Sequence, residues 1–251
     1  MAGLAVEGSN PDVSLLYDIN GIAADAPGWA DRTVEFVGEY GILLGLVLVG
    51  IWCWWRGRGR GSAEDSVASA AALVWAPLAA GIALLVNIPI RGFVERPRPF
   101  MEHRGLEVLV AGKSDFSFVS DHATLAMALA VGIFMADRKL GVVALLLAAV
   151  AGFCRVYMGV HYPTDVVGGF ALGTAVTLLL APLAMMLLTP AVAALSRWGA
   201  TASLVRSRRA RDADAERRAA ALAGQVRAAA RARHEGDGGS GTDRGFNDLA
   251  A

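Results

Sequence analysis

The chain has 251 residues, 55% of them hydrophobic, and its 23 basic and 23 acidic side chains give a formal net charge of zero. A mean hydropathy of +0.47 excludes an ordinary soluble domain, and the length allows several membrane spans. Two cysteines, Cys53 and Cys154, both in or beside apolar runs, give no support for a disulfide framework.

The N-terminal region is predicted to lie on a membrane surface. Apolar residues recur at helical spacing from Val13 to Phe36, with a break at Pro27. This pattern indicates an amphipathic interfacial segment over residues 1–30, and a soluble N-terminal cap fits the periodicity equally well. The N-terminus lacks the basic region followed by an apolar one that a cleaved signal peptide requires, so we expect none.

Five apolar stretches follow, and each is a candidate membrane span. They cover Tyr40 to Trp55, Val67 to Ile90, Ala123 to Ala136, Leu140 to Phe153, and Val166 to Leu188. A helix needs about 20 residues to cross the hydrocarbon, so the first, third and fourth must extend into their flanks. The sequence therefore predicts an all-α protein, an integral membrane bundle of about five transmembrane helices over residues 31–198.

Basic residues in the connections predict the orientation of this bundle. They follow the first span, separate the third from the fourth, and follow the fifth: Arg56, Arg58, Arg60, Arg138, Lys139 and Arg197. Lys and Arg accumulate on the cytoplasmic side, so these connections are expected inside. The segments Arg91 to Val119 and Tyr157 to Asp165 then face outward, although the first carries an excess of cations. An anionic substrate explains this excess, and the alternative is a loop whose own acids satisfy the cations: Glu95, Glu102, Glu107 and Asp115.

The C-terminal region, residues 199–251, is predicted to be a cytoplasmic tail. Its Ala- and Arg-rich part, Arg206 to Arg233, favours a helix, and the Gly, Asp and Ser content from His234 onward favours disorder. The helix fits contact with anionic lipids and simple solvation equally well, and binding to nucleic acid is not expected.

Three polar clusters stand at the edges of the apolar stretches. They are Arg91 with Arg98-Pro99, Ser120-Asp121-His122, and Arg155 with His161 and Asp165. Hydrolysis of a phosphate ester without a metal needs cations for the non-bridging oxygens, a nucleophile, and an acid for the leaving group. The clusters supply candidates for all three needs.

Each cluster has an ordinary structural interpretation when it is taken alone. Arginines before prolines are typical of surface loops, and Arg96 lies in the same neighbourhood, so spacing alone does not exclude it from the site. Ser120 before an apolar helix is typical of an N-cap, and its helix start would also attract phosphate. The His161 and Asp165 pair fits a structural contact, or a carboxylate that fixes an imidazole for attack on phosphorus.

Taken together and in this order, the clusters resemble the signature of the type 2 phosphatidic acid phosphatase superfamily, which includes the vanadium haloperoxidases. That signature is Lys, six residues, Arg-Pro; then Pro-Ser-Gly-His; then Ser-Arg, five residues, His, three residues, Asp. The resemblance covers about residues 32–188 and implies a helical bundle with its site at the extracytoplasmic end. It also implies that no metal or organic cofactor is needed.

By position in that signature, each polar residue receives an expected role. His161 would be the nucleophile that forms a phosphohistidine, Asp165 its orienting carboxylate, and His122 the general acid. The residues expected to bind the substrate phosphate are Arg91, Arg98, Ser120, Asp121 and Arg155.

The sequence departs from the family pattern at four positions, which carry Arg91, Val119, Asp121 and Cys154 in place of Lys, Pro, Gly and Ser. Arg91 keeps the charge of lysine but changes the hydrogen-bond geometry. A carboxylate at Asp121 would disfavour a phosphate dianion unless it bonds to an arginine or helps to handle protons.

The Ser-Asp-His form is similar to that of the undecaprenyl-diphosphatase branch associated with bacitracin resistance. We therefore expect a multi-pass cell-membrane enzyme that converts undecaprenyl diphosphate to undecaprenyl phosphate, with polyprenyl diphosphates or other lipid phosphates and membrane lipids as partners. The alternatives are a phosphatidic-acid-type phosphatase of other specificity, a haloperoxidase that multiple spans disfavour, and a non-catalytic lipid-anion carrier.

Overall fold

The structure is a computed structural model that describes residues 10–59, 62–110, 112, 114–198, 201–206 and 208–237. Every regular element in these residues is a helix. The chain divides into two compact units, Met1–Arg206 and Ser207–Ala251. In the second unit the described part is one helix, α10 (Arg208–Asp237), so the predicted Arg- and Ala-rich helix forms. It continues through His234–Asp237, the first residues for which disorder was predicted, and the rest of that prediction, residues 238–251, lies outside the described part.

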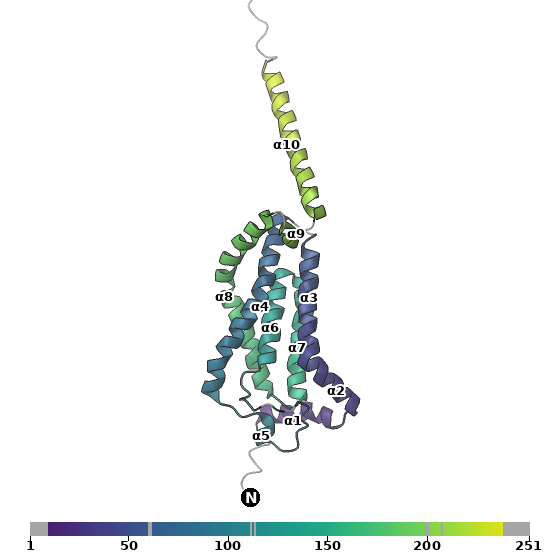
Figure 1. The fold of residues 1–251 in the computed structure, drawn as a ribbon, viewed down its shortest axis with the longest axis vertical. Coiled ribbons are helices and arrows are strands. Elements are labelled where there is room, and N and C mark those ends of the chain that lie inside the picture. The colour runs from purple at the N-terminus through teal and green to yellow at the C-terminus, as the bar shows by residue number, and fades with distance from the viewer. Residues whose placement is uncertain are drawn as a thin grey trace, which may run out of the picture. The chain divides into compact units, whose positions relative to one another are not determined.

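The first unit is a bundle of five apolar helices that run alternately up and down, as Figure 1 shows. They are α3 (Ile42–Gly57), α4 (Ala63–Val94), α6 (Asp121–Ala136), α7 (Arg138–Tyr157) and α8 (Pro163–Arg197). Each matches one of the five predicted apolar stretches.

Within the described residues, four helical segments are long and apolar enough to cross a membrane: Gly28–Gly57, Ala63–Glu102, Arg138–Tyr157 and Pro163–Arg197. The fifth apolar helix, α6, has 16 residues and falls short of the approximately 20 that a span requires. α6 packs against α4, α7 and α8, and this central position explains why a shorter helix is accommodated.

Small residues allow α6 to lie close to its neighbours. A Cβ added to Gly132 would lie 2.4 Å from the Ala76 Cβ on α4, and one added to Gly173 on α8 would lie 2.5 Å from the carbonyl oxygen of Thr124. Close packing through small residues is a common basis of helix association in membranes. The close contact between Gly173 and Thr124 allows the first turns of α6 to lie near α8.

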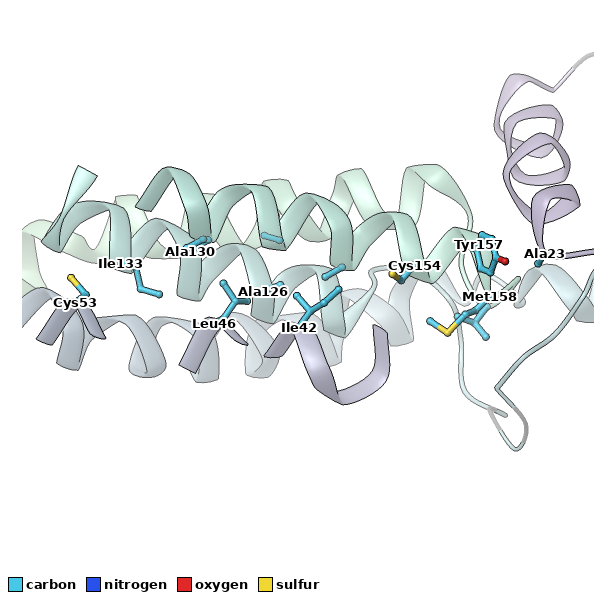
Figure 2. Close-up of a cluster of buried hydrophobic side chains, with 14 residues drawn as sticks. Ala23, Ile42, Leu46, Cys53, Ala126, Ala130, Ile133, Cys154, Tyr157 and Met158 are labelled. Atoms are coloured by element: carbon cyan, nitrogen blue, oxygen red, sulfur yellow. The ribbon is translucent and has the colours of Figure 1, made fainter. Parts of the chain in front are cut away.

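A cluster of buried apolar side chains joins α3, α6 and α7, and Figure 2 shows it. Its labelled members on these helices are Ile42, Leu46, Cys53, Ala126, Ala130, Ile133, Cys154 and Tyr157. The cysteines are free and buried, in agreement with a packing role.

The N-terminal elements lie at one end of the bundle, where α4 and α7 end and α6 and α8 begin (Figure 1). These elements are α1 (Pro11–Ala24), α2 (Gly28–Phe36) and a π-helical segment η2 (Val37–Gly41), and the short α5 (Pro99–Glu102), which follows α4, lies at the same end. Asn20 of α1 ties this end together, because its Nδ2 donates to the carbonyl oxygens of Glu107 and Tyr157, each at 2.8 Å. The short α9 (Ala202–Val205) lies at the opposite end.

Candidate active site

The first polar cluster lies where α4 stops. Glu95, the C-cap, has a φ of 49°, in the left-handed region, and the prolines at 97 and 99 keep the following residues out of the helix. The chain therefore turns, and Arg98 is carried into the protein with only 3% of its surface exposed.

The Arg98 guanidinium is fixed by three hydrogen bonds. Its Nε donates to the Asp115 carbonyl oxygen at 2.9 Å, its Nη1 to the Val160 carbonyl oxygen at 3.0 Å, and its Nη2 to the Asp115 carboxylate at 2.7 Å. Burial alone would raise the pKa of Asp115. The hydrogen bond from Arg98 and the charges of Arg98 and Arg91 outweigh this effect, so the pKa of Asp115 lies below its ordinary value. Asp115 is therefore a fixed anion between two arginines.

Arg91 binds two carboxylates, Asp115 in the loop before α6 and Asp121 at the start of α6. Its Nη1 donates to Asp115 Oδ2 at 3.0 Å, and its Nη2 contacts Asp121 Oδ1. Asp121 also accepts from Nδ2 of the buried Asn87 at 2.7 Å. The carboxylate that replaces glycine in the family pattern thus bonds to an arginine, which is the condition under which it can lie beside a phosphate.

Ser120 occupies the N-cap position of α6, but its side chain does not cap the helix. Its hydroxyl is fully buried and has no hydrogen-bond partner among the residues that the structure describes. Its backbone N–H donates to the Asp165 carbonyl oxygen at 3.1 Å, which joins the starts of α6 and α8. A buried hydroxyl without a partner is costly, so this one points to a ligand.

His161 lies in the turn between α7 and α8 and is 5% exposed. Its Nδ1 is 2.9 Å from the Ser117 carbonyl oxygen, and because a carbonyl only accepts, Nδ1 carries the proton. The Asp165 Oδ2 lies 3.7 Å from the same nitrogen. The other ring nitrogen, Nε2, keeps its lone pair and lies 3.5 Å from Nη1 of Arg98.

The electrostatic surroundings keep His161 neutral. Burial of the imidazole lowers the pKa of His161, and the Arg98 and Arg155 guanidiniums act in the same direction. Asp165 raises the pKa, but not enough to reverse the shift. A neutral imidazole whose Nε2 carries no proton and accepts only a long contact from Arg98 is a competent nucleophile.

Asp165 is completely buried and is held on both oxygens. Its Oδ2 accepts from the Tyr162 backbone N–H at 2.9 Å, and its Oδ1 accepts from Nη1 of Arg96 at 2.8 Å. Arg96 reaches Asp12 of α1 through Nη2 at 2.7 Å, and its guanidinium lies 3.6 Å from the centre of the Tyr162 ring. Arg96 therefore binds the carboxylate behind His161.

Arg155 and His122 meet at a carboxylate from the N-terminal region. The buried Arg155 donates from Nη1 to Glu39 Oε2 at 2.6 Å, and His122 Nε2 lies 3.8 Å from the same oxygen. The Nε and Nη2 of Arg155 are buried and have no hydrogen-bond partner in the described part of the chain.

All eight residues singled out from the sequence lie at one end of the bundle, in two sets of contacts. Arg155 and His122 meet at Glu39, and the other six are linked through contacts to Asp115 and Asp165. Sequence reasoning did not single out four further members of the site: Asp12, Glu39, Asn87 and the carbonyl of Ser117. It named Asp115 only as an acid that could satisfy the loop arginines, and the structure shows that Asp115 does accept from Arg91 and Arg98. Asn87 was noticeable as a polar residue inside a span, and Glu39 as an acid just before one. Pairing of Asp12 with Arg96, 84 positions apart, has no local signal.

The site combines a neutral imidazole with three buried groups, Arg98, Arg155 and Ser120, that suit an anion. Fixed guanidiniums and a hydroxyl around a nucleophile are the components that phosphoryl transfer requires.

Comparison with known proteins agrees with this chemistry. The PAP2 superfamily matches residues 71–188. The chain is 30% identical to undecaprenyl-diphosphatase BcrC of Bacillus subtilis over 139 aligned residues. The aligned region covers 55% of this chain and 66% of that protein. It is 34% identical over 169 residues to decaprenylphosphoryl-5-phosphoribose phosphatase of Mycobacterium tuberculosis, which spans 66% of this chain and 86% of that protein.

A solved structure shares the fold. The transmembrane PAP2 type phosphatidylglycerolphosphate phosphatase from Bacillus subtilis superposes with a TM-score of 0.50 at 24% identity, over 73% of this chain and 90% of that one. The chain therefore belongs to the PAP2 superfamily, as a multi-pass membrane lipid phosphatase.

Proposed function

We propose that the protein removes the terminal phosphate of a polyprenyl diphosphate, undecaprenyl diphosphate above all, and so regenerates the lipid phosphate carrier used in cell-wall synthesis. The Ser-Asp-His form of the second cluster and the similarity to an undecaprenyl-diphosphatase support this substrate. The observation that carries the proposal is the His161 geometry, in which Nδ1 donates to Ser117 and Nε2 is left for attack beside Arg98.

The reaction has two steps. In the first, His161 Nε2 attacks the terminal phosphorus, the bond to the bridging oxygen breaks, and His122 gives a proton to the departing lipid phosphate. In the second, water attacks the phosphohistidine, His122 takes a proton from that water, and the phosphorus–nitrogen bond breaks to restore His161. Asp165 holds the imidazole and stabilises its charged form.

The phosphate-binding groups divide into two sets. Arg98, Arg155 and Ser120 are buried, and the unpartnered Ser120 hydroxyl and Arg155 nitrogens support direct contact with the phosphoryl oxygens. Arg91 and Asp121 lie nearer the surface, with side-chain exposures of 21% and 44%. We assign this second set to the outer part of the diphosphate and to entry of the substrate.

We propose that this end of the bundle faces the outside of the cell. The basic connections, including Arg56, Arg138 and Arg197, lie at the opposite end of the helices, where cytoplasmic residues are expected. The tail from residue 199 would then be cytoplasmic. Cysteine labelling of whole cells tests this orientation, with single cysteines placed at exposed positions near Arg104 and Arg138.

An apolar cavity in the half of the bundle away from the site suits the far part of a lipid tail. It has a volume of about 510 Å³ and lies between α3, α4, α6, α8 and α9. Its lining on α6 starts at Leu129, seven residues beyond His122 and thus about 10 Å along the helix. A polyprenyl chain bound by its diphosphate at the site can reach this depth.

The decisive experiment is phosphate release by the purified protein from undecaprenyl diphosphate, phosphatidate and phosphatidylglycerophosphate. We expect the highest kcat/KM for the polyprenyl diphosphate, and loss of release from every substrate in His161→Ala with insertion intact. Preference for phosphatidate or phosphatidylglycerophosphate would replace the proposed substrate but keep the chemistry. Binding of the lipid without any phosphate release would indicate a carrier.

A further inference from the structure

Glu39 lies outside the three polar clusters and outside the residues that match the family, yet it contacts two members of the candidate site. One carboxylate oxygen, Oε2, accepts from Nη1 of Arg155 at 2.6 Å and lies 3.8 Å from Nε2 of His122. Its side chain is 15% exposed, so solvent screens these contacts only in part.

The backbone is shaped to bring this carboxylate inward. Glu39 lies in the π-helical segment η2, and such segments occur frequently at functional sites. The preceding Gly38 is buried against α7: a Cβ there would lie 2.8 Å from the Cys154 Cβ and 3.2 Å from the Met158 Cε. Glycine thus permits the close approach that carries Glu39 to Arg155.

Glu39 both pairs with the buried cation Arg155 and lies near His122. Arg155 uses one nitrogen for Glu39, and its Nε and Nη2 have no partner in the described residues, so they stay available for a phosphate. The same oxygen faces His122, the candidate acid. A carboxylate beside an imidazole favours the charged form of that ring, and a general acid must keep its proton until the leaving oxygen departs.

We propose that Glu39 is a positioning residue of the reaction: anchored by Arg155, its negative charge holds His122 in the protonated form that donates to the leaving oxygen. This inference rests on the proposed function. In the first step the proton passes from His122 to the leaving oxygen as the phosphorus–oxygen bond breaks. In the second step His122 recovers a proton from the attacking water.

The test is Glu39→Gln, because glutamine keeps an oxygen that accepts from Arg155 and removes only the charge. The matched control is Glu35→Gln, one turn earlier in α2, because the carboxylate that pairs with Arg155 and lies near His122 is that of Glu39. With ³²P-labelled polyprenyl diphosphate, we expect Glu39→Gln to lower kcat about 10-fold, a part of the 10²–10⁴-fold that a general acid contributes, with little change in KM. Glu35→Gln should match the wild type.

A double-mutant cycle separates this role from a structural one. In a His122→Ala background the acid is gone, so Glu39→Gln should cost less than about 2-fold, whereas an independent structural defect would cost the same about 10-fold in both backgrounds. Glu39→Asp keeps the charge and should recover part of the rate, with melting temperature reported for every variant. Equal losses in both backgrounds, or a Glu39→Gln rate equal to wild type, would overturn the proposal. If the wild-type protein released no phosphate, the proposed function itself would fail instead.

Discussion

Replacing Arg96 by glutamine should damage both stability and turnover. Arg96 donates to Thr164 Oγ1 at 2.7 Å, to Asp165 Oδ1 at 2.8 Å and to Asp12 Oδ2 at 2.7 Å. Asp165 is fully buried and Asp12 is 9% exposed at the side chain. Removing the cation leaves two largely buried carboxylates, one of them directly behind the candidate nucleophile.

The size of the effect follows from this burial. Removing one partner of a buried ion pair costs about 3–5 kcal/mol, and the 25% exposure of the Arg96 side chain places the expected loss near the lower end, about 3 kcal/mol. For a chain of this length each kcal/mol corresponds to about 2–4 °C, so the melting temperature should fall by about 6–12 °C. Turnover should fall as well, because Asp165 loses one of its two fixed contacts.

Thermal unfolding in detergent, together with kcat/KM on a polyprenyl diphosphate, measures both effects. Arg96→Lys keeps the charge but not the two-pronged geometry and should lie between the wild type and Arg96→Gln. Arg104→Gln removes an exposed arginine from the neighbouring loop and should change neither quantity. An Arg96→Gln protein with wild-type melting temperature and turnover would refute the assigned ion pairs.

Three further predictions concern other parts of the molecule. Protonated His161 cannot attack phosphorus, and burial lowers the pKa of His161. The acid limb of kcat/KM against pH should therefore lie below about 6.5, the ordinary pKa of histidine. An acid limb above that value would contradict the burial argument. Ser120→Ala removes a buried hydroxyl without a protein partner, so unfolding should be unchanged while kcat/KM falls about 2- to 10-fold, and an unchanged rate would remove Ser120 from the phosphate site. Gly173→Ala places a Cβ 2.5 Å from the Thr124 carbonyl oxygen and should cost about 1–3 kcal/mol in unfolding, whereas Gly81→Ala, with nothing within 4 Å, should be neutral or stabilising.

Much of the fold could be predicted because the forces that form it are local in sequence. Each of the five apolar stretches forms a helix, because a backbone in lipid must satisfy its own hydrogen bonds. The boundaries could not be predicted as well. The helix predicted over Val67 to Ile90 runs from Ala63 to Val94, and Pro77 and Pro89 lie inside it without ending it.

The candidate site was predictable as a set of residues and unpredictable as a set of contacts. The spacing of Arg98, Ser120, His161 and their neighbours indicated phosphate chemistry before any geometry was known. No local pattern indicated that the Nδ1 proton of His161 goes to a backbone carbonyl, with the carboxylate 3.7 Å away. Nor did any local pattern separate Arg96 from Arg98, which differ by two positions and bind opposite sides of the same histidine–aspartate pair.

The sequence alone thus determined that the protein is an all-helical membrane protein and which side chains are the candidates for its chemistry, because hydropathy and motif spacing are properties of the chain itself. The tertiary structure decided which of these groups are neutralised and which stay available. Asp115 and Asp121 engage Arg91, Asp12 and Asp165 engage Arg96, and Glu39 takes one nitrogen of Arg155. Such pairings join residues 24 to 116 positions apart, and only the packing of α1, η2, α4 and α8 around α6 and α7 brings them together.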